Sequence, residues 1–440
     1  MRMRSALIAI PVVAAALLTA VMPAGASPAG PGRLAGPPPA GISQARMTQA
    51  RMPSLPGLPA AGPEGQAAGR ILDDVFNGDS CTTQPDNPSI MSTCVAIGFF
   101  SDVSVVNGLL EFSDNGQWFG NTFGGLQTVT DPIEVSCVPQ QADIPVCVAV
   151  GEHYANPAFP VQLVATGGAN GFSPLTLGNP RGANWSGLGD VSCARSTACM
   201  LVGAAGTARR TPRGLVYTSH ATAYRWNGAA LRQLAVPAPA HARASELAGV
   251  SCPTATTCMA VGNYTNAAGR SLPYSALRTN GTWHVQAAPT IRGRASTNFQ
   301  AVSCPTAAGC VAVGDADTPG NTAFAERYAG GRWTVQRIAP EPLSAFFSVS
   351  CPVASHCVAV GEHGTRSLIE AWNGTRWTMQ AVPGTRAPLT TDGLDHVSCV
   401  TPAICTAVGF RHNPAVRFSF QTLALGWNGS RWTIQKTINE

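Results

Sequence analysis

Short acidic and histidine-containing segments are the parts of this 440-residue chain that could do chemistry. The dipeptide Glu-His occurs twice, as Glu152-His153 and Glu362-His363, and these two side-chain types can bind metal ions or transfer protons. Further charged residues lie in segments before and after the second copy. Together they give six candidate ligand-binding residues, which are Asp315, Asp317, Glu362, His363, Arg411 and His412. They could recognise a polar ligand or a cation, supply an acid–base group, or be ordinary solvated loop residues.

The sequence carries no familiar catalytic fingerprint. It contains no H-E-x-x-H, G-x-S-x-G, P-loop or dinucleotide-binding motif. Pairs of cysteines with five residues between them, and no second pair close by, do not match the spacings of zinc sites. We therefore assign no catalytic residue, no metal ligand and no cofactor.

Fourteen cysteines define a repeat that must position the charged segments. They form seven consecutive pairs, in which a Ser precedes the first Cys and the second Cys is followed by two or three small apolar residues and a Gly. The pairs are Cys81 with Cys94, Cys137 with Cys147, Cys193 with Cys199, Cys252 with Cys258, Cys304 with Cys310, Cys351 with Cys357, and Cys399 with Cys405. So regular a period indicates a repeat protein, and an even cysteine count in an exported chain predicts disulfides within the pairs.

The sixth unit shows the expected strands most clearly. Four short apolar or alternating stretches flank a polar turn and the hairpin signal Asn373-Gly374, and they span residues 346–351, 357–360, 367–372 and 376–380. Successive first cysteines lie 47 to 59 residues apart, which accommodates four antiparallel strands and is typical of a propeller blade. We predict an all-β fold over residues 71–440: a seven-bladed β-propeller with four antiparallel strands and one disulfide per blade.

Each disulfide should staple the hairpin made by the first two strands of a blade. A tight turn between antiparallel strands brings the two sulfurs together without strain, and closing so short a loop contributes about 2–3 kcal/mol in the chain-entropy model. These staples act within blades. No strand is evident near Arg70 that would complete blade seven, so the sequence leaves open how the ring closes.

Units in which an Asn-Gly or Gly-Gly turn precedes Trp resemble kelch-type and Asp-box-type propeller repeats. Residues 113–118, Ser-Asp-Asn-Gly-Gln-Trp, are similar to an Asp-box that is one residue short before its Gly, and the other units lack the Ser-x-Asp. The Val-Ser-Cys and Cys-x-Ala-Val-Gly phrases also resemble a group of secreted bacterial repeat proteins without an assigned activity. The resemblance implies the propeller fold. It brings no sialidase active site, because that family's arginine triad and nucleophile cannot be placed here.

The loops between the second and third strands of each unit, called B–C loops, are the best place for a site. They vary in length and chemistry, whereas the A–B and C–D turns on the opposite face are short and uniform. The two Glu-His pairs fall in nearly opposite blades, roughly 20 Å or more apart given strand spacings of about 4.8 Å, which argues against a shared metal ion. Blades five to seven are adjacent, so the six candidates could line one patch. The cluster Arg209, Arg210 and Arg213 could meet an anionic polymer, or could be a solvated loop.

The N-terminal residues predict export. A basic start, an apolar run over residues 6–22 and the small-residue site Ala24-Gly25-Ala26 form a signal peptide of residues 1–26, with an uncleaved membrane anchor as the alternative. Residues 27–70, with nine prolines and eight glycines, should be a disordered linker. After cleavage we expect no membrane span. A net charge of +5 without a dense basic run argues against nucleic acid as a partner.

These observations predict a secreted protein, extracellular or associated with the cell wall. We expect a non-catalytic binding module whose partner is a glycan or a protein. The alternative is an extracellular glycoside hydrolase or lyase that uses acidic residues on the B–C face.

Overall fold

The structure is a computed structural model. It describes residues 73–82, 93–101, 106–114, 116–122, 130–139, 145–154, 159–168, 171–175, 177–212, 214–317, 321–338, 342–384, 391–412 and 420–438. The predicted signal peptide, residues 1–26, and the predicted linker, residues 27–70, lie outside these described residues.

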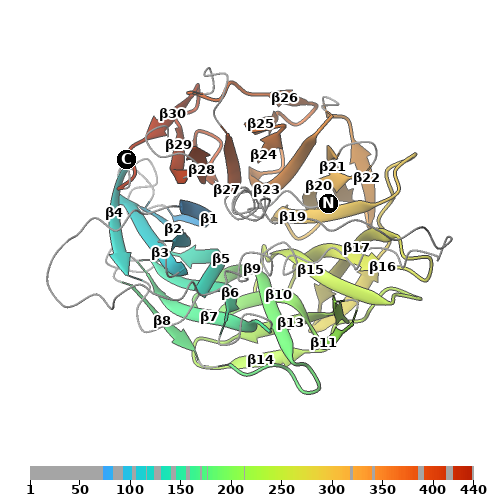
Figure 1. Cartoon of the computed structure of the whole chain (residues 1–440). Helices are drawn as coiled ribbons and strands as arrows, with labels where there is room; N and C mark the ends of the chain where they lie inside the picture. The colour runs from blue at the N-terminus through green and yellow to red at the C-terminus, as the bar shows by residue number, and fades with distance from the viewer. Residues whose placement is uncertain are drawn as a thin grey trace, which may run out of the picture.

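Seven blades of four antiparallel strands stand around a central axis, as predicted (Figure 1). One parallel pair, Asp73 with Phe420, joins the first and last blades into a single sheet of eight strands. The strands of each blade are given from the inside outward. Blade one contains β1 (Asp73–Thr82), β2 (Thr93–Ser101), β3 (Val106–Asp114) and β4 (Gln117–Thr122), and blade two contains β5 (Thr130–Val138), β6 (Val146–His153), β7 (Val161–Gly168) and β8 (Gly171–Leu175). Blade three contains β9 (Trp185–Arg195), β10 (Ala198–Gly206), β13 (His220–Trp226) and β14 (Leu231–Leu234).

Blade four contains β15 (Ala244–Ser251), β16 (Cys258–Thr265), β17 (Ser271–Thr279) and β18 (Thr282–Gln286), and blade five contains β19 (Thr297–Thr306), β20 (Gly309–Ala316), β21 (Thr322–Ala329) and β22 (Arg332–Gln336). Blade six contains β23 (Ser344–Val353), β24 (His356–His363), β25 (Arg366–Trp372) and β26 (Trp377–Met379). Blade seven contains β27 (Asp392–Thr401), β28 (Ile404–His412), β29 (Phe420–Trp427) and β30 (Trp432–Gln435). The described residues contain no helix that is long and apolar enough to cross a membrane.

The arginine-rich insertion of blade three is a hairpin and not the irregular loop that we expected. Strand β11 (Ala208–Thr211) pairs with β12 (Gly214–Tyr217), and Arg209 and Arg210 lie on β11 opposite Val216 and Leu215. The third arginine of the predicted cluster, Arg213, lies outside the described residues.

All seven predicted disulfides are present, and the chain has no free cysteine. Each joins the first two strands of one blade, with Cα–Cα separations of 3.9 to 4.1 Å. The bonded pairs are Cys81 and Cys94, Cys137 and Cys147, Cys193 and Cys199, Cys252 and Cys258, Cys304 and Cys310, Cys351 and Cys357, and Cys399 and Cys405. The short spacing within each pair therefore staples a hairpin, as predicted.

The two cysteines of a pair differ in their surroundings. In blades one, two, three and seven they are direct partners in the strand register, as in Cys81 opposite Cys94. The second cysteine of every pair is at most 3% exposed, and it belongs to the apolar core between its blade and a neighbouring blade. These buried cysteines are Cys94, Cys147, Cys199, Cys258, Cys310, Cys357 and Cys405. The staple therefore also ties the hairpin to the core.

The glycine that ends the repeat phrase has a steric role. In every blade the innermost strand carries a one-residue bulge four positions before its cysteine, such as Phe347 in β23. The glycine of the second strand, such as Gly361, sits beside that bulge. A Cβ atom on any of the seven glycines would overlap a main-chain carbonyl oxygen of the innermost strand, for example that of Ala345. The bulge and the glycine therefore require each other.

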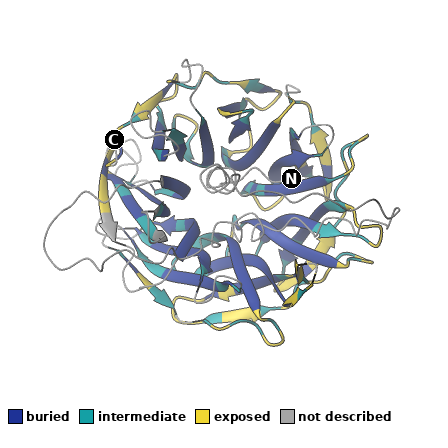
Figure 2. Ribbon diagram, viewed as in Figure 1, coloured by how far each residue is buried: buried dark blue, intermediate teal, exposed yellow. Residues whose placement is uncertain are grey.

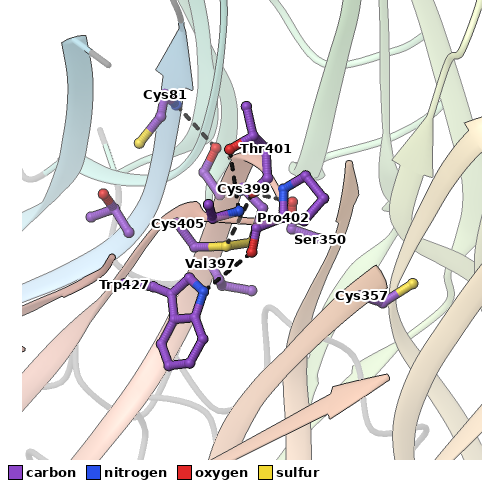
Figure 3. The surroundings of a disulfide bond; sticks show 12 residues. Cys81, Ser350, Cys357, Val397, Cys399, Thr401, Pro402, Cys405 and Trp427 are labelled. Atoms are coloured by element: carbon purple, nitrogen blue, oxygen red, sulfur yellow. Dashed lines mark hydrogen bonds between the residues drawn. A yellow bond between two sulfur atoms is a disulfide. The ribbon is translucent and has the colours of Figure 1, made fainter. Parts of the chain in front are cut away.

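The serine before the first cysteine links neighbouring blades. The main-chain N–H of Cys351 in blade six donates to Ser303 Oγ in blade five at 3.0 Å, and Cys399 donates in the same way to Ser350 Oγ at 2.9 Å (Figure 3). The other five joints repeat this bond at 2.9 to 3.0 Å. The seven bonds form a closed inner belt around the ring, which we call the serine belt.

Apolar cores fill the joints between blades and not the interior of single blades. One cluster combines Val313 and Ala325 of blade five with Phe346, Leu368 and Trp377 of blade six. The other joints are built alike, and tryptophans of the outermost strands are buried in them. Figure 2 shows this gradient, with buried residues on the inner strands and exposed residues at the rim. Because each core needs two blades, no blade can bury its apolar surface alone.

The ring closes without exchange of a strand, which answers the question that the sequence left open. Blade seven takes its outermost strand, β30, from its own unit, and β1 to β4 complete blade one (Figure 1). The joint between them, which we call the seam, is held by the same serine bond, from the N–H of Cys81 to Ser398 Oγ at 3.0 Å. Farther out, Trp118 Nε1 donates to Gln435 Oε1 at 3.0 Å.

Removing one bond of the serine belt should weaken the ring measurably. The substitution Ser303→Ala leaves the N–H of Cys351 without its acceptor, which should lower the free energy of unfolding by about 1–2 kcal/mol. Urea unfolding with the disulfides intact measures this. Ser355→Ala, in an exposed A–B turn, is the matched control and should change stability by less than about 0.5 kcal/mol. Equal stability of the two variants would contradict a role for the belt.

Candidate functional site

The two predicted aspartates of blade five are bound by their own blade. Asp315, at the end of β20, is only 2% exposed, and its Oδ1 accepts a hydrogen bond from Gln300 Nε2 at 2.8 Å. Asp317 follows the strand and is half-buried, and its Oδ2 accepts a hydrogen bond from Ser296 Oγ at 3.2 Å. Both carboxylates thus bind residues around the start of β19, the innermost strand of their blade, and only Asp317 is partly exposed to solvent.

Glu362 of blade six reaches into the joint with blade seven. Its carboxylate lies against Gly393, where a Cβ atom would crowd it, and it is 5% exposed. Burial, and after it the negative charges of Asp395 and Asp392, raise the pKa of Glu362 well above its usual value. A neutral carboxyl beside ionised ones is the arrangement that acid–base catalysis needs. Here, however, all three side chains are at most 6% exposed, which keeps them from a polymeric ligand.

His363, Arg411 and His412 lie at the ends of β24 and β28 and are half-buried. The main-chain N–H of His412 donates to Thr391 O at 2.7 Å, and its ring meets Phe420 edge-on with centroids 6.2 Å apart. The predicted patch is therefore divided. The aspartates belong to blade five, Glu362 belongs to a buried acidic group with blade seven, and the other three are accessible, with Asp317, at the B–C end.

The glutamate of the other Glu-His pair, Glu152-His153, faces a different joint. Glu152 of blade two is 1% exposed, accepts a hydrogen bond from Tyr154 Oη, and lies against Gly187 of blade three. With Trp185 and Glu246 it lines a cavity of about 270 Å³, including space open to solvent. The two pairs thus point into separate blade joints. Among the described residues, no group of three His, Cys, Asp or Glu side chains is arranged to hold a metal ion.

A histidine at the seam bridges two acidic side chains of the inner strands. His396 of blade seven places Nδ1 2.8 Å from Asp79 Oδ1 of blade one and Nε2 3.2 Å from Glu134 Oε2 of blade two. Gly78 makes the reach possible, because a Cβ atom there would crowd Glu134. Asp190 of blade three adds a further negative charge nearby. We call His396, Asp79 and Glu134 the seam bridge.

The seam bridge holds protons beyond neutral pH. Burial acts to lower the pKa of His396, but the charge of Glu134 and the hydrogen bond with Asp79 outweigh it and raise the pKa to about 9. Burial also raises the pKa of Glu134 to about 8, against the opposing charge of His396. Nδ1 faces Asp79, whose main-chain N–H also approaches it at 3.2 Å, and Nε2 faces Glu134, so both ring nitrogens are engaged within the bridge. Neither nitrogen is left to accept a proton from a substrate, which makes the bridge structural.

Sequence reasoning missed these residues because they sit inside strands. The residue two positions before the first cysteine is Val in units two to seven, but it is Asp79 in unit one. The residue three positions before the first cysteine varies more, and it is Gly, Glu, Asp, Gly, Ala, Ser and His in units one to seven. Such variation inside an otherwise uniform phrase was the available signal. Asp392 and Asp395 were hidden in the same way.

Two grooves open at the rim of the turn face, away from the B–C loops, and share one wall. The first lies between blades six and seven, encloses about 1080 Å³ including space open to solvent, and is lined by Gln380, Pro383, Trp427, Arg431 and Trp432 among others. The second, of about 680 Å³, lies at the seam, and its lining combines Trp427 with small, apolar and polar residues. The sequence had pointed away from this face because its turns are short.

Trp427 is held in place and is still accessible. Its Nε1 donates to Pro402 O at 3.2 Å (Figure 3), and its ring packs against Trp432 with centroids 5.5 Å apart. It is half-buried, whereas Trp372, at the same place in blade six, is only 8% exposed. At the seam the facing residues are small, Ser113 and Gly116, which leaves the second groove open beside the indole. The arrangement suits stacking and hydrogen bonding better than bond cleavage.

Comparison with known proteins supports the fold. The chain matches no protein-family model, and no curated protein sequence matches it. Among solved structures, it is similar to "YCF48 bound to D1 peptide" (13% identity, 81% of this chain and 99% of that chain, TM-score 0.42) and to "Hadza microbial sialidase Hz136" (11%, 72% and 73%, 0.44). It is also similar to a PL25 ulvan lyase bound to -[GlcA(1-4)Rha3S]- (9%, 83% and 97%, 0.50). At 9% identity the likeness to the lyase, which has the highest TM-score of the three, concerns the fold alone.

The stability of the protein should fall as the pH rises from about 6.5 to about 9. Because the folded-state pKa of His396 is raised, its stabilisation is complete below 6.5 and is lost as the pH passes about 9. The difference corresponds to about 3 kcal/mol. Unfolding measured at pH 6 and pH 9.5 should show this slope, reduced in His396→Gln and unchanged in His284→Asn, which alters an exposed histidine. An undiminished slope in His396→Gln would exclude the bridge as its source.

Glu326 should act in the opposite sense at another joint, because its burial opposes folding. Both of its carboxylate oxygens are buried without a hydrogen-bond partner in the described structure, and burial raises its pKa to about 8. The carboxyl ionises near pH 4.5 in the unfolded chain, so at pH 7 folding must return a proton to it, which lowers the free energy of unfolding. Glu326→Gln should therefore stabilise the protein by about 3–4 kcal/mol at pH 7–8 and by about 1 kcal/mol at pH 5. Thermal unfolding across this range tests it, and destabilisation at pH 8 would contradict it.

Proposed function

We propose that the protein is an exported, non-catalytic propeller that binds an extracellular glycan or protein. The observation that carries this proposal is Trp427, a fixed and accessible indole that forms the shared wall of two grooves. Rigid aromatic side chains that keep an open face lose little entropy on binding and are frequent anchors of recognition. Seven disulfides fit an oxidising, extracellular location.

Burial of the acidic residues favours binding over catalysis. A hydrolase or lyase that uses acidic residues must hold them within hydrogen-bond reach of its substrate. Asp315, Glu362 and the seam bridge instead face neighbouring strands and blades and are engaged there. The phrases Val-Ser-Cys and Cys-x-Ala-Val-Gly, on which we base kinship with secreted bacterial repeat proteins, serve the belt and the bulge and carry no catalytic group.

The B–C face is a second proposed contact surface, now limited to four residues. Asp317, His363, Arg411 and His412 are half-buried and can meet a ligand. Asp315 and Glu362 are buried and would contribute only by holding the loops. Variable loops on a rigid scaffold still favour recognition there.

A binding experiment separates these possibilities. The exported full chain is tested against a panel of glycans and purified cell-wall polymers, with affinity and turnover both measured. We expect saturable binding without turnover. Trp427→Ala should weaken it about tenfold or more, because the stacking plate is lost. Met379→Ala, which truncates an exposed side chain of blade six, is the control and should bind normally.

Other outcomes have clear meanings. Turnover that Glu362→Gln abolishes would replace this proposal with the hydrolase or lyase. Binding that survives Trp427→Ala and is lost in Arg411→Ala would move the site to the B–C face. The absence of saturable binding to any glycan or protein would overturn the proposal and leave a structural spacer.

A further inference from the structure

The groove between blades six and seven combines an aromatic plate with hydrogen-bonding groups. Trp427 and Trp432 form one side, and residues 380–384, which follow β26, form the other. Gln380 and Ser430 lie in the lining, and amide and hydroxyl groups can bond the hydroxyls of a sugar. A pyranose ring presents a face of C–H groups that packs on an indole while its hydroxyls remain outward. The shape and chemistry therefore fit a saccharide better than an apolar ligand.

On the turns and outermost strands of blades five to seven, the charges around this groove have one sign. Arg431 lines it and is exposed, and the two preceding blades place Arg376 and Arg332 at the same point of the repeat, directly before the tryptophan of the outermost strand. Lys436 and Arg337 add exposed cations on the same rim. The turns and outermost strands of blades five to seven, residues 304–310, 330–338, 351–357, 373–384, 399–405 and 428–438, are all described and contain no Asp or Glu.

Cations on edge strands can also have a purely protective role, because they discourage edge-to-edge aggregation. Protection alone, however, gives no reason for an open groove with an accessible indole next to Arg431. A surface of one sign raises the local concentration of an oppositely charged polymer. The indole of Trp427, the hydrogen-bonding groups and the exposed cations together fit a ligand that is both a sugar and an anion.

We propose that the groove beside Trp427 binds an acidic polysaccharide, in which one sugar ring stacks on the indole and a carboxylate or sulfate group of the chain pairs with Arg431. This inference rests on the proposed binding function and names its ligand class. Arg376 and Arg332 extend the cationic path along the rim for neighbouring acidic units.

The test uses the exported full chain and polymers of defined charge. Polygalacturonate and dextran sulfate represent the two anionic groups, dextran is the neutral polymer, and poly-glutamate is an acidic chain without sugar rings. We expect binding to at least one acidic polysaccharide, weakened by salt because exposed charges are screened. Which of the two binds distinguishes a carboxylate from a sulfate ligand.

Matched variants locate the site. Arg431→Ala should weaken binding about tenfold, because a charge-assisted hydrogen bond is lost. Arg195→Ala removes one exposed cation from the turn face of blade three and should stay within about twofold of the wild type. Trp427→Ala should abolish measurable binding and Trp427→Phe should restore part of it. Unchanged melting temperatures would show that Arg431→Ala and Trp427→Phe remain folded.

Several results would overturn the inference. Equal loss in Arg431→Ala and Arg195→Ala would show attraction by net charge alone. Equally tight binding of poly-glutamate would indicate an acidic protein partner. Binding of dextran but not of the acidic polymers, if it depends on Trp427, would reject the charge class and leave the proposed binding function intact. Failure of every glycan and protein to bind would reject both.

Discussion

The bond from a cysteine N–H to the serine hydroxyl of the preceding blade is the interaction on which this ring depends. A blade buries its apolar side chains only against its neighbours, so the angle between blades must be repeated closely at seven joints. One short hydrogen bond, made by adjacent residues of the same phrase, sets that spacing at the innermost strand, where a small error would grow toward the rim. The disulfide beside it fixes the hairpin that presents both partners.

The repeat phrase can thus be understood residue by residue. Its serine joins blades, its cysteines close the hairpin, and its glycine makes room for the bulge of the innermost strand. None of these roles needs a catalytic group. Chemistry specific to this protein must lie where units differ from one another, which is why the seam bridge, the acidic group around Glu362 and the Trp427 grooves stand out against the background of the repeat.

Local features of the sequence were sufficient to predict the strands and the disulfides, because a tight turn between close cysteines and an Asn-Gly hairpin are decided within a few residues. The contacts of Glu362 were not predictable in this way. Its acidic neighbours, Asp392 and Asp395, lie on the first strand of the following blade, where they looked like ordinary strand positions. The seam bridge joins residues 317 positions apart, His396 and Asp79, so no local pattern could pair them. The accessibility of Trp427 depends on small residues of blade one across the seam.

Closure without strand exchange has a consequence for how such a ring can be rearranged. Each blade is encoded by one uninterrupted stretch of chain, and the last joint uses the same bond as the six internal joints, from a cysteine N–H to a serine hydroxyl. The point at which the polypeptide begins is therefore not dictated by the architecture. A gene reordered to start at another unit, with the old ends joined, would still encode seven whole blades, and His396 and Asp79 would then sit at an internal joint.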